Sequence, residues 1–318
     1  MKKCVLALLI AAILLAQSTE AVAFWVWSPK TNKFTDPKNT PLDNPDRQFQ
    51  WAMKFFEGKD YKRAAEEFTS LTKTFKDSSL APEAQYYIGR SHEAAGRLFP
   101  AFTAYQKTID VYPFTKRTDE IIERQFDIGN MFFEKHRGTL MGKEIMTDLT
   151  RAVEVFNKVR DNSPFGEYAD RAQYMIGESY TKSEQFGEAA EAFQKLVDEH
   201  PESSLMDRAR YEIARTTYLA SLKPDYDQEL TEEAIQEFKE VAMDSSTVII
   251  SEQAENAIAV LENKKAESLF NTAKFYQSQK HYKSAAIYYR EILDKYPESA
   301  SGELALSSLR QIGRFLEK

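Results

Sequence analysis

The sequence predicts an all-α protein, a right-handed solenoid of about six stacked helix pairs. From residue 46 onward, apolar residues recur at the i, i+3, i+4, i+7 spacing of amphipathic helices. One helix-pair pattern returns six times in register, whereas alternating Val/Ile/Thr runs bounded by Asn-Gly turns are missing. Because one helix pair cannot bury its apolar faces alone, the copies are expected to stack on one another.

The clearest copy is the stretch Ala172–Pro201. Its first helix carries small Gly177 beside Tyr180, and its second helix carries small Ala189 and bulky Phe193 on one stripe. Small residues are needed where two helices cross closely, so we expect a bulky residue at Gly177 to be destabilising. A helix, a turn and a second helix over about 34 residues are the signature of a tetratricopeptide repeat.

The other five copies align with this one. In each first helix an aromatic residue precedes a small residue by three positions, and the aromatics are Phe49, Tyr86, Phe126, Tyr174, Tyr211 and Phe270. In each second helix an aromatic lies four positions after an alanine, at Phe68, Tyr105, Phe156, Phe193, Phe238 and Tyr289. Such agreement indicates one repeated structural unit, hence tetratricopeptide-like helix pairs throughout.

The chain divides into four segments. Residues 1–23 are expected to be a cleaved secretory signal, with a basic start, the apolar run Val5–Ala16 and a small-residue cleavage site ending at Ala23. Residues 24–47 form a leader rich in proline and aromatics, residues 48–247 hold five repeats, and residues 248–318 hold a long helix, a closing repeat and a capping helix. The single cysteine, Cys4, lies within the signal.

The four prolines of the leader forbid a regular helix there. One interpretation is an extended segment whose aromatics pack on the first repeat. The other is that Phe24, Trp25 and Trp27 contact a partner or a membrane surface.

Insertions interrupt the strict period. Lys135–Asp148 and Ser221–Leu230 lengthen the third and fifth repeats, while Ile249–Ser278 reads as one helix without proline or glycine. Insertions on a solenoid emerge as loops, often on a binding face. Ser204 and Asp207 have the spacing of a capping box at the start of the fifth repeat.

No chemistry of catalysis or metal binding is predicted. The four histidines lack metal-ligand spacing, and neither a G-x-S-x-G nor a glycine-rich phosphate motif is found. With 42 basic and 49 acidic residues, the net charge of −7 disfavours a nucleic-acid track. We expect a non-enzymatic protein with no cofactor and no metal, whose partners are proteins.

The first helices are expected to line the concave wall of the solenoid. A peptide groove is therefore predicted from the aromatic row and the residues that follow the small positions. Its members are Phe49, Met53, Tyr86, Arg90, Phe126, Asn130, Tyr174, Glu178 and Tyr211. The alternative is that these aromatics only pack between adjacent repeats. A row of aromatics with a polar rim would suit an extended or helical peptide.

The last third of the sequence resembles the BamD family, the β-barrel assembly subunit of the outer membrane. The residues that carry the resemblance are Ala273–Tyr276, Tyr282–Ala286, Tyr289-Arg290 and Leu293–Pro297, and the order of elements agrees from Gln48 to about Leu309. Family members usually carry a lipid-bearing cysteine after the signal, whereas this signal ends in Ala23 and no lipobox is found.

This resemblance implies a periplasmic scaffold at the outer membrane that binds the barrel-inserting subunit and unfolded outer-membrane proteins. In the family the closing end docks the barrel-inserting subunit. Lys264 and Lys265 add local positive charge there, so they are the predicted docking residues; the alternative is a solvated helix face. A second functional hypothesis is a general envelope coordinator of the Tol–Pal or cell-wall type, which shares the repeats and the cleaved signal.

Overall fold

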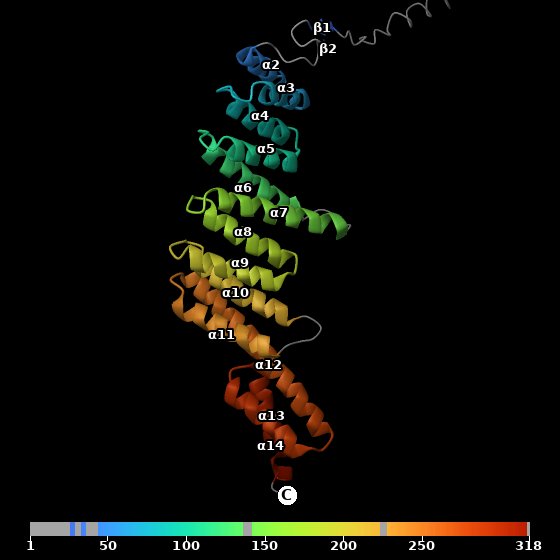
Figure 1. The fold of residues 1–318 in the computed structure, drawn as a ribbon. Helices are drawn as coiled ribbons and strands as arrows, with labels where there is room; N and C mark the ends of the chain where they lie inside the picture. Colours follow the sequence, from blue (N-terminus) through green and yellow to red (C-terminus); the bar gives the residue numbers. More distant parts are fainter. Residues whose placement is uncertain (1–25, 29–32, 36–43, 136–141, 223–227, 317–318) are drawn as a thin grey trace, which may run out of the picture. The chain divides into compact units, whose positions relative to one another are not determined.

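The computed structural model describes residues 26–28, 33–35, 44–135, 142–222 and 228–316 (Figure 1). The chain divides into two compact units. The first unit ends at Thr115, and the second begins at Lys116. In the first unit, two short strands are followed by two helix pairs. The elements are β1 Val26–Ser28, β2 Lys33–Thr35, α2 Pro45–Glu57, α3 Tyr61–Thr74, α4 Ala81–Ala94 and α5 Leu98–Val111.

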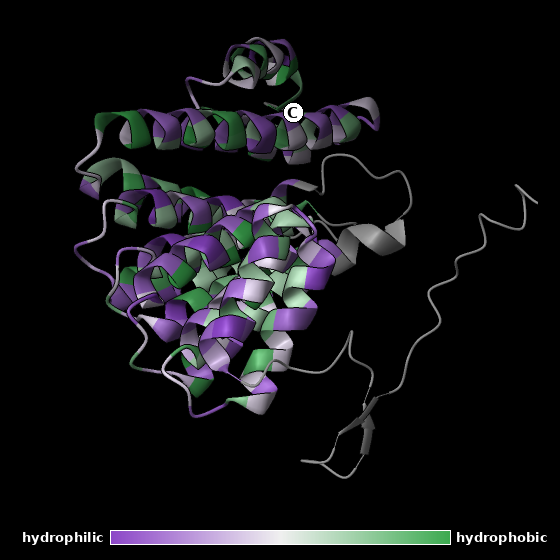
Figure 2. Cartoon of the chain, turned by 90° about the horizontal axis from the view of Figure 1, so that it is seen from above, coloured by the Kyte–Doolittle hydropathy of each residue, from purple (hydrophilic) through white to green (hydrophobic). Residues whose placement is uncertain are grey.

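The second unit continues the helical pattern, and each of its helices packs against the next in sequence. Its elements are α6 Thr118–Lys135, α7 Gly142–Asn162, α8 Ala169–Lys182, α9 Phe186–Glu199, α10 Met206–Ser221, α11 Gln228–Asp244, α12 Val248–Ser278, α13 Tyr282–Lys295 and α14 Ala300–Leu316. The expected helical solenoid of tetratricopeptide-like pairs is confirmed. Figure 2 shows polar and apolar residues alternating around the helices, as amphipathic packing requires.

In three helix pairs a glycine of the first helix faces an aromatic ring of the second helix. A Cβ atom added at Gly89 would lie 2.4 Å from the ring of Tyr105, and one added at Gly177 would lie 2.5 Å from the ring of Phe193. Both rings are fully buried. The prediction that Gly89 and Gly177 lie where the two helices of a pair cross is therefore confirmed. A larger side chain at either position would leave no room for the ring.

Buried glutamines add a polar link between the two helices of a pair. Gln85 Nε2 donates to the carbonyl of Ala104 at 3.2 Å, and Gln173 Nε2 donates to that of Ala192 at 2.7 Å. Because a buried amide without a partner would be destabilising, these bonds explain why a polar residue is accommodated in the core.

The turns inside the pairs share a left-handed residue. Lys59, Glu184 and Lys280 have φ values of 61°, 60° and 62°, and Gly96 takes the same place in the second repeat with φ 70°. Only Gly96 adopts this conformation without steric cost.

Helix α12 serves two successive layers of the second unit. Its first half packs into the core of α10 and α11 through Ile250, Ala254 and Leu261. Its second half packs through Ala266 and Ala273 into the core of α13 and α14. The predicted uninterrupted long helix is confirmed, with one more residue at its start.

The leader and the two insertions lie partly outside the described residues. The leader contains the antiparallel pair β1–β2, which the sequence did not predict; residues 1–25 lie outside the described residues. The insertions are described only in part, since residues 136–141 and 223–227 lie outside the described residues; Gly142 already begins α7.

The capping-box prediction is wrong. Helix α10 begins at Met206, and its N-terminus has no side-chain cap. Instead, Asp207 Oδ2 accepts four hydrogen bonds from the α11–α12 loop: from Ser245 Oγ, from Ser246 N and Oγ, and from Thr247 Oγ1, at 2.7–3.2 Å. Asp207 thus links one repeat to the next.

Among the described residues, no helix is long and apolar enough to cross a membrane.

Candidate functional site

The predicted aromatic row packs against the second helices. In all six repeats the first-helix aromatic contacts the second-helix aromatic, with ring centroids 5.3–5.8 Å apart. Tyr86 is 1% exposed and Phe126 is 5% exposed, so these two are core residues. Phe49, Tyr174 and Tyr211 are half-buried and keep one edge at the surface. These aromatics therefore pack within their own repeats, on the ring of the second helix, and the peptide groove stays a prediction.

The polar members of the predicted groove are half-buried, as is Met53. Arg90 Nη1 donates to Tyr86 Oη at 3.0 Å, which covers that tyrosine from the surface side. Asn130 lies at the matching place on α6. The predicted row is divided between the two units, with Phe49, Met53, Tyr86 and Arg90 in the first unit.

One end of the row does form a polar network in the second unit. Arg208, Glu212 and Arg215 follow one another at i, i+4 and i+7 along α10, so they share one helix face. Arg208 Nε lies 3.0 Å from Glu212 Oε1, and Arg215 Nε contacts Glu212 Oε2. The carboxylate of Glu212 is thus held between two guanidinium groups.

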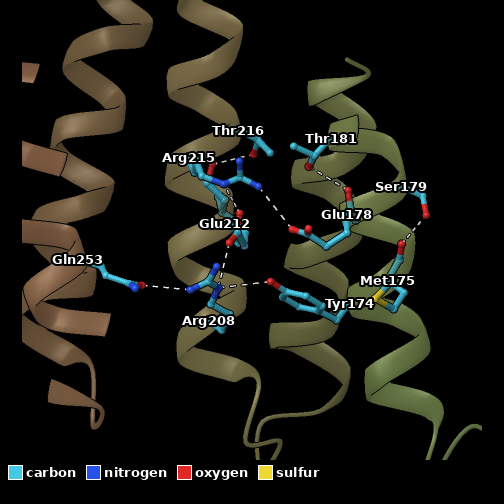
Figure 3. A network of polar contacts seen from close by, with 12 residues as sticks. Tyr174, Met175, Glu178, Ser179, Thr181, Arg208, Glu212, Arg215, Thr216 and Gln253 are labelled. Atoms are coloured by element: carbon cyan, nitrogen blue, oxygen red, sulfur yellow. Dashed lines mark hydrogen bonds and ion pairs between the residues drawn. The ribbon is translucent and has the colours of Figure 1, made fainter. Parts of the chain in front are cut away.

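Neighbouring helices complete this network, which we call the α10 network (Figure 3). From α8, Glu178 Oε1 accepts from Arg215 Nη2 at 3.4 Å, and Tyr174 Oη accepts from Arg208 Nε at 3.4 Å. From α12, Gln253 Oε1 accepts from Arg208 Nη1 at 3.1 Å. Glu212 has no exposed surface, whereas the two arginines remain partly exposed. A buried carboxylate requires such pairing.

The α10 network forms the polar side of an open pocket of about 560 Å³ between α8, α10 and α12, here called the α10 pocket. Its apolar side comes from Tyr211, Tyr218, Phe238, Val260 and Leu261. Val260 is 61% exposed although it lies in this wall. Mixed polar and apolar walls of this kind are typical of binding sites.

The phenol of Tyr174 and the carboxyl group of Glu178 have shifted pKa values. Burial, followed by repulsion from Glu212, raises the pKa of Glu178 above its ordinary value, although Arg215 and Arg208 act in the opposite direction. Burial, followed by the nearby carboxylates Glu212 and Glu178, raises the pKa of Tyr174 to about 12. Tyr174 therefore stays neutral at physiological pH, and burial disfavours the ionised form of Glu178.

The two predicted docking lysines face different neighbours. Lys264 Nζ lies 5.6 Å from the centroid of the Tyr218 ring, at the edge of the α10 pocket. Lys265 contacts Glu232 of α11, and burial followed by repulsion from Lys295 lowers its pKa. The structure thus brings Lys264, but not Lys265, next to Tyr218 of the α10 pocket.

Sequence reasoning missed Arg208, Glu212, Arg215 and Gln253. The signal that could have found three of them is the alternating charge at i, i+4, i+7 on a first helix, flanked by Tyr211 and Tyr218. Among the described residues, no group of three or more histidine or acidic side chains is arranged to hold a metal ion. Reversible binding of another molecule is what this arrangement supports best.

The sequence matches two family models. Residues 143–317, more than half of the chain, match the YfiO model, described as an outer membrane lipoprotein, and residues 83–115 match a tetratricopeptide repeat model. The comparison with curated proteins finds no match.

Solved structures with likeness to this chain include tetratricopeptide repeat proteins. A thermophilic TPR protein of Thermus thermophilus is 13% identical, with 68% of this chain and 99% of that chain covered and a TM-score of 0.35. The C-terminal part of a TPR repeat-containing protein from Cytophaga hutchinsonii is 15% identical, with 85% and 90% covered and a TM-score of 0.37. PilW, a type IV pilus biogenesis factor, is 17% identical, with 83% and 99% covered and a TM-score of 0.29.

Proposed function

The chain belongs to the YfiO family of outer membrane lipoproteins, and from this membership we propose that it is a BamD-like scaffold for outer-membrane protein assembly. In this function it binds the barrel-inserting subunit and segments of unfolded outer-membrane proteins. The observation that carries the proposal is the match over residues 143–317, which span α7 to α14 and include the α10 pocket and the closing repeat.

The helix repeats and the open pocket support a non-enzymatic, protein-binding function. Stacked helix pairs present long surfaces to protein partners. The α10 pocket offers charged, amide and aromatic groups on three rigid helices, which can hold one side chain and its neighbours in a defined orientation. We place this function in the periplasm, at the outer membrane, after export by the predicted signal.

A second candidate function is an envelope coordinator of the Tol–Pal or cell-wall type. The sequence feature that favours it is Cys4, the single cysteine, which precedes the apolar run of the predicted signal instead of following it. A lipid anchor on cysteine would require the reverse order.

Co-purification from native envelopes tests the two candidates. The chain, tagged at its C-terminus, should bring down a barrel-inserting outer-membrane subunit at moderate salt. Recovery of Tol or cell-wall synthesis proteins without that subunit would refute the assembly function and support the coordinator. Intact mass of the same sample measures the anchor, since a lipid-sized increment would contradict cleavage at Ala23.

A further inference from the structure

The α10 network has donors that its own acceptors do not use. Arg208 donates Nε to Tyr174 and Nη1 to Gln253 and forms an ion pair with Glu212. Arg215 donates Nε to Glu212 and Nη2 to Glu178. Within the part of the chain that the structure describes, no acceptor contacts Arg208 Nη2 or Arg215 Nη1. Both arginines line the α10 pocket, so a ligand entering it meets guanidinium groups.

The charged groups around the α10 pocket also favour an anionic ligand. Arg208 and Arg215 line the pocket with Glu178 and Glu212, and Lys264 lies against Tyr218 at its edge. The guanidinium groups in the wall and the ammonium group at its edge favour an anionic group in this pocket.

Glu178 and Glu212 hold the arginines with unequal strength. Glu212 is fully buried and contacts both guanidinium groups, so it belongs to the fold. Glu178 is partly exposed and makes one long contact, 3.4 Å from Arg215. Its raised pKa agrees with a carboxylate that is poorly stabilised where it lies.

We propose that the α10 pocket binds a carboxylate of a polypeptide partner, and that Glu178 occupies the place of this carboxylate on Arg215 in the unbound protein. A guanidinium group binds a carboxylate in two parallel hydrogen bonds, which a better-placed partner group forms at the expense of the 3.4 Å contact. The apolar wall of Tyr211, Tyr218 and Val260 suits an apolar side chain next to the carboxylate. A carboxylate beside an apolar side chain is the chemistry of a peptide segment. The choice of a polypeptide as the partner rests on the proposed function.

The test uses the purified full-length chain and dye-labelled synthetic peptides, in fluorescence anisotropy at low salt. The first probe is a blocked peptide with a Phe-Glu-Phe core, and the second has Gln in place of Glu. A third probe is the Gln peptide with a free C-terminus, which distinguishes a chain-terminal carboxylate from a side-chain carboxylate. We expect the Glu peptide, the free-terminus peptide or both to bind at least about fivefold more tightly than the blocked Gln peptide.

Two variants of the pocket should change the affinity for the carboxylate peptide in opposite directions. Glu178→Gln should bind it at least about threefold more tightly, because the competing carboxylate is gone, while Glu191→Gln on the exposed face of α9 should leave binding unchanged. Lys264→Gln should weaken binding about threefold, whereas Lys274→Gln on the exposed face of the same helix should not. Neither Glu178 nor Lys264 pairs with buried Glu212, so these variants leave the core intact.

Three results would overturn the proposal. The first is equal binding of all three peptides. The second is unchanged or weaker binding of the carboxylate peptide by Glu178→Gln. The third is tight binding of inorganic phosphate with no preference among the peptides, since the pocket would then be a simple anion site. Because no envelope protein takes part, these results are independent of the co-purification that tests the scaffold function.

Discussion

Gly177→Leu is the sharpest test of the helix crossing. A Cβ atom at this position would lie 2.5, 2.6 and 2.7 Å from three ring atoms of Phe193. Since carbon atoms pack at about 3.5–4.0 Å, the ring would have to move by about 1 Å. The ring is fully buried and also contacts Tyr174 at 5.3 Å between centroids, so it has no space to move into.

The expected loss is about 1–3 kcal/mol, the range for overpacking a core, even after the higher helix propensity of leucine is counted. For a unit of this size that is a fall in Tm of roughly 2–12 °C. Circular dichroism melts and urea titrations measure it. The matched control is Gly187→Leu on α9, where an added Cβ meets nothing within 4 Å, and which should gain about 0.5–1 kcal/mol from helix propensity. Equal effects of the two substitutions would refute the crossing argument.

Two further predictions concern loops. Burial raises the pKa of Asp207, but hydrogen bonds from Ser246, Ser245 and Thr247 outweigh it and hold the pKa below its ordinary value. The stabilisation that ionised Asp207 gives is therefore present above about pH 4 and is lost as the pH falls through the lowered pKa of the folded protein. Asp207→Asn should lower the free energy of unfolding by about 1.5–3 kcal/mol at pH 7. In urea titrations, the difference between this variant and the wild type should become smaller near pH 3. Lys280→Gly should raise the free energy of unfolding by up to about 1 kcal/mol in the same titrations, because glycine adopts the left-handed conformation of residue 280 without steric cost. An unchanged free energy of unfolding would contradict this prediction.

The period of the sequence was enough to predict the helix pairs, the crossings and the long helix. Each depends on a local rule, because a small residue opposite an aromatic ring is needed wherever two helices cross closely. The same rules could not decide where the aromatic row points. Tyr86 and Tyr174 occupy the same place in their repeats, yet Tyr86 is buried beneath Arg90 while Tyr174 reaches Arg208 of the next repeat.

Polar contacts between repeats were the features that the sequence could not supply. Ser204 and Asp207 have capping-box spacing, but Asp207 finds stronger partners in the loop that ends about 40 residues later. That outcome depends on how one repeat stacks on the next. In the same way, Glu212 has the spacing of an ordinary surface salt bridge and becomes buried only because neighbouring helices cover α10.

Helix α12 explains why the pocket lies where it does. Its first half is fixed in the core beside α10 by Ile250 and Leu261, which brings Gln253 to Arg208 and Val260 to the pocket wall. One turn beyond Val260, the same helix sets Lys264 against the Tyr218 ring before it enters the closing core. A helix broken near residue 260, as two separate repeats would require, would leave these groups on independent elements. The uninterrupted helix therefore holds Gln253, Val260 and Lys264 in one rigid wall opposite the arginines of α10, which favours recognition of a single carboxylate in a fixed orientation.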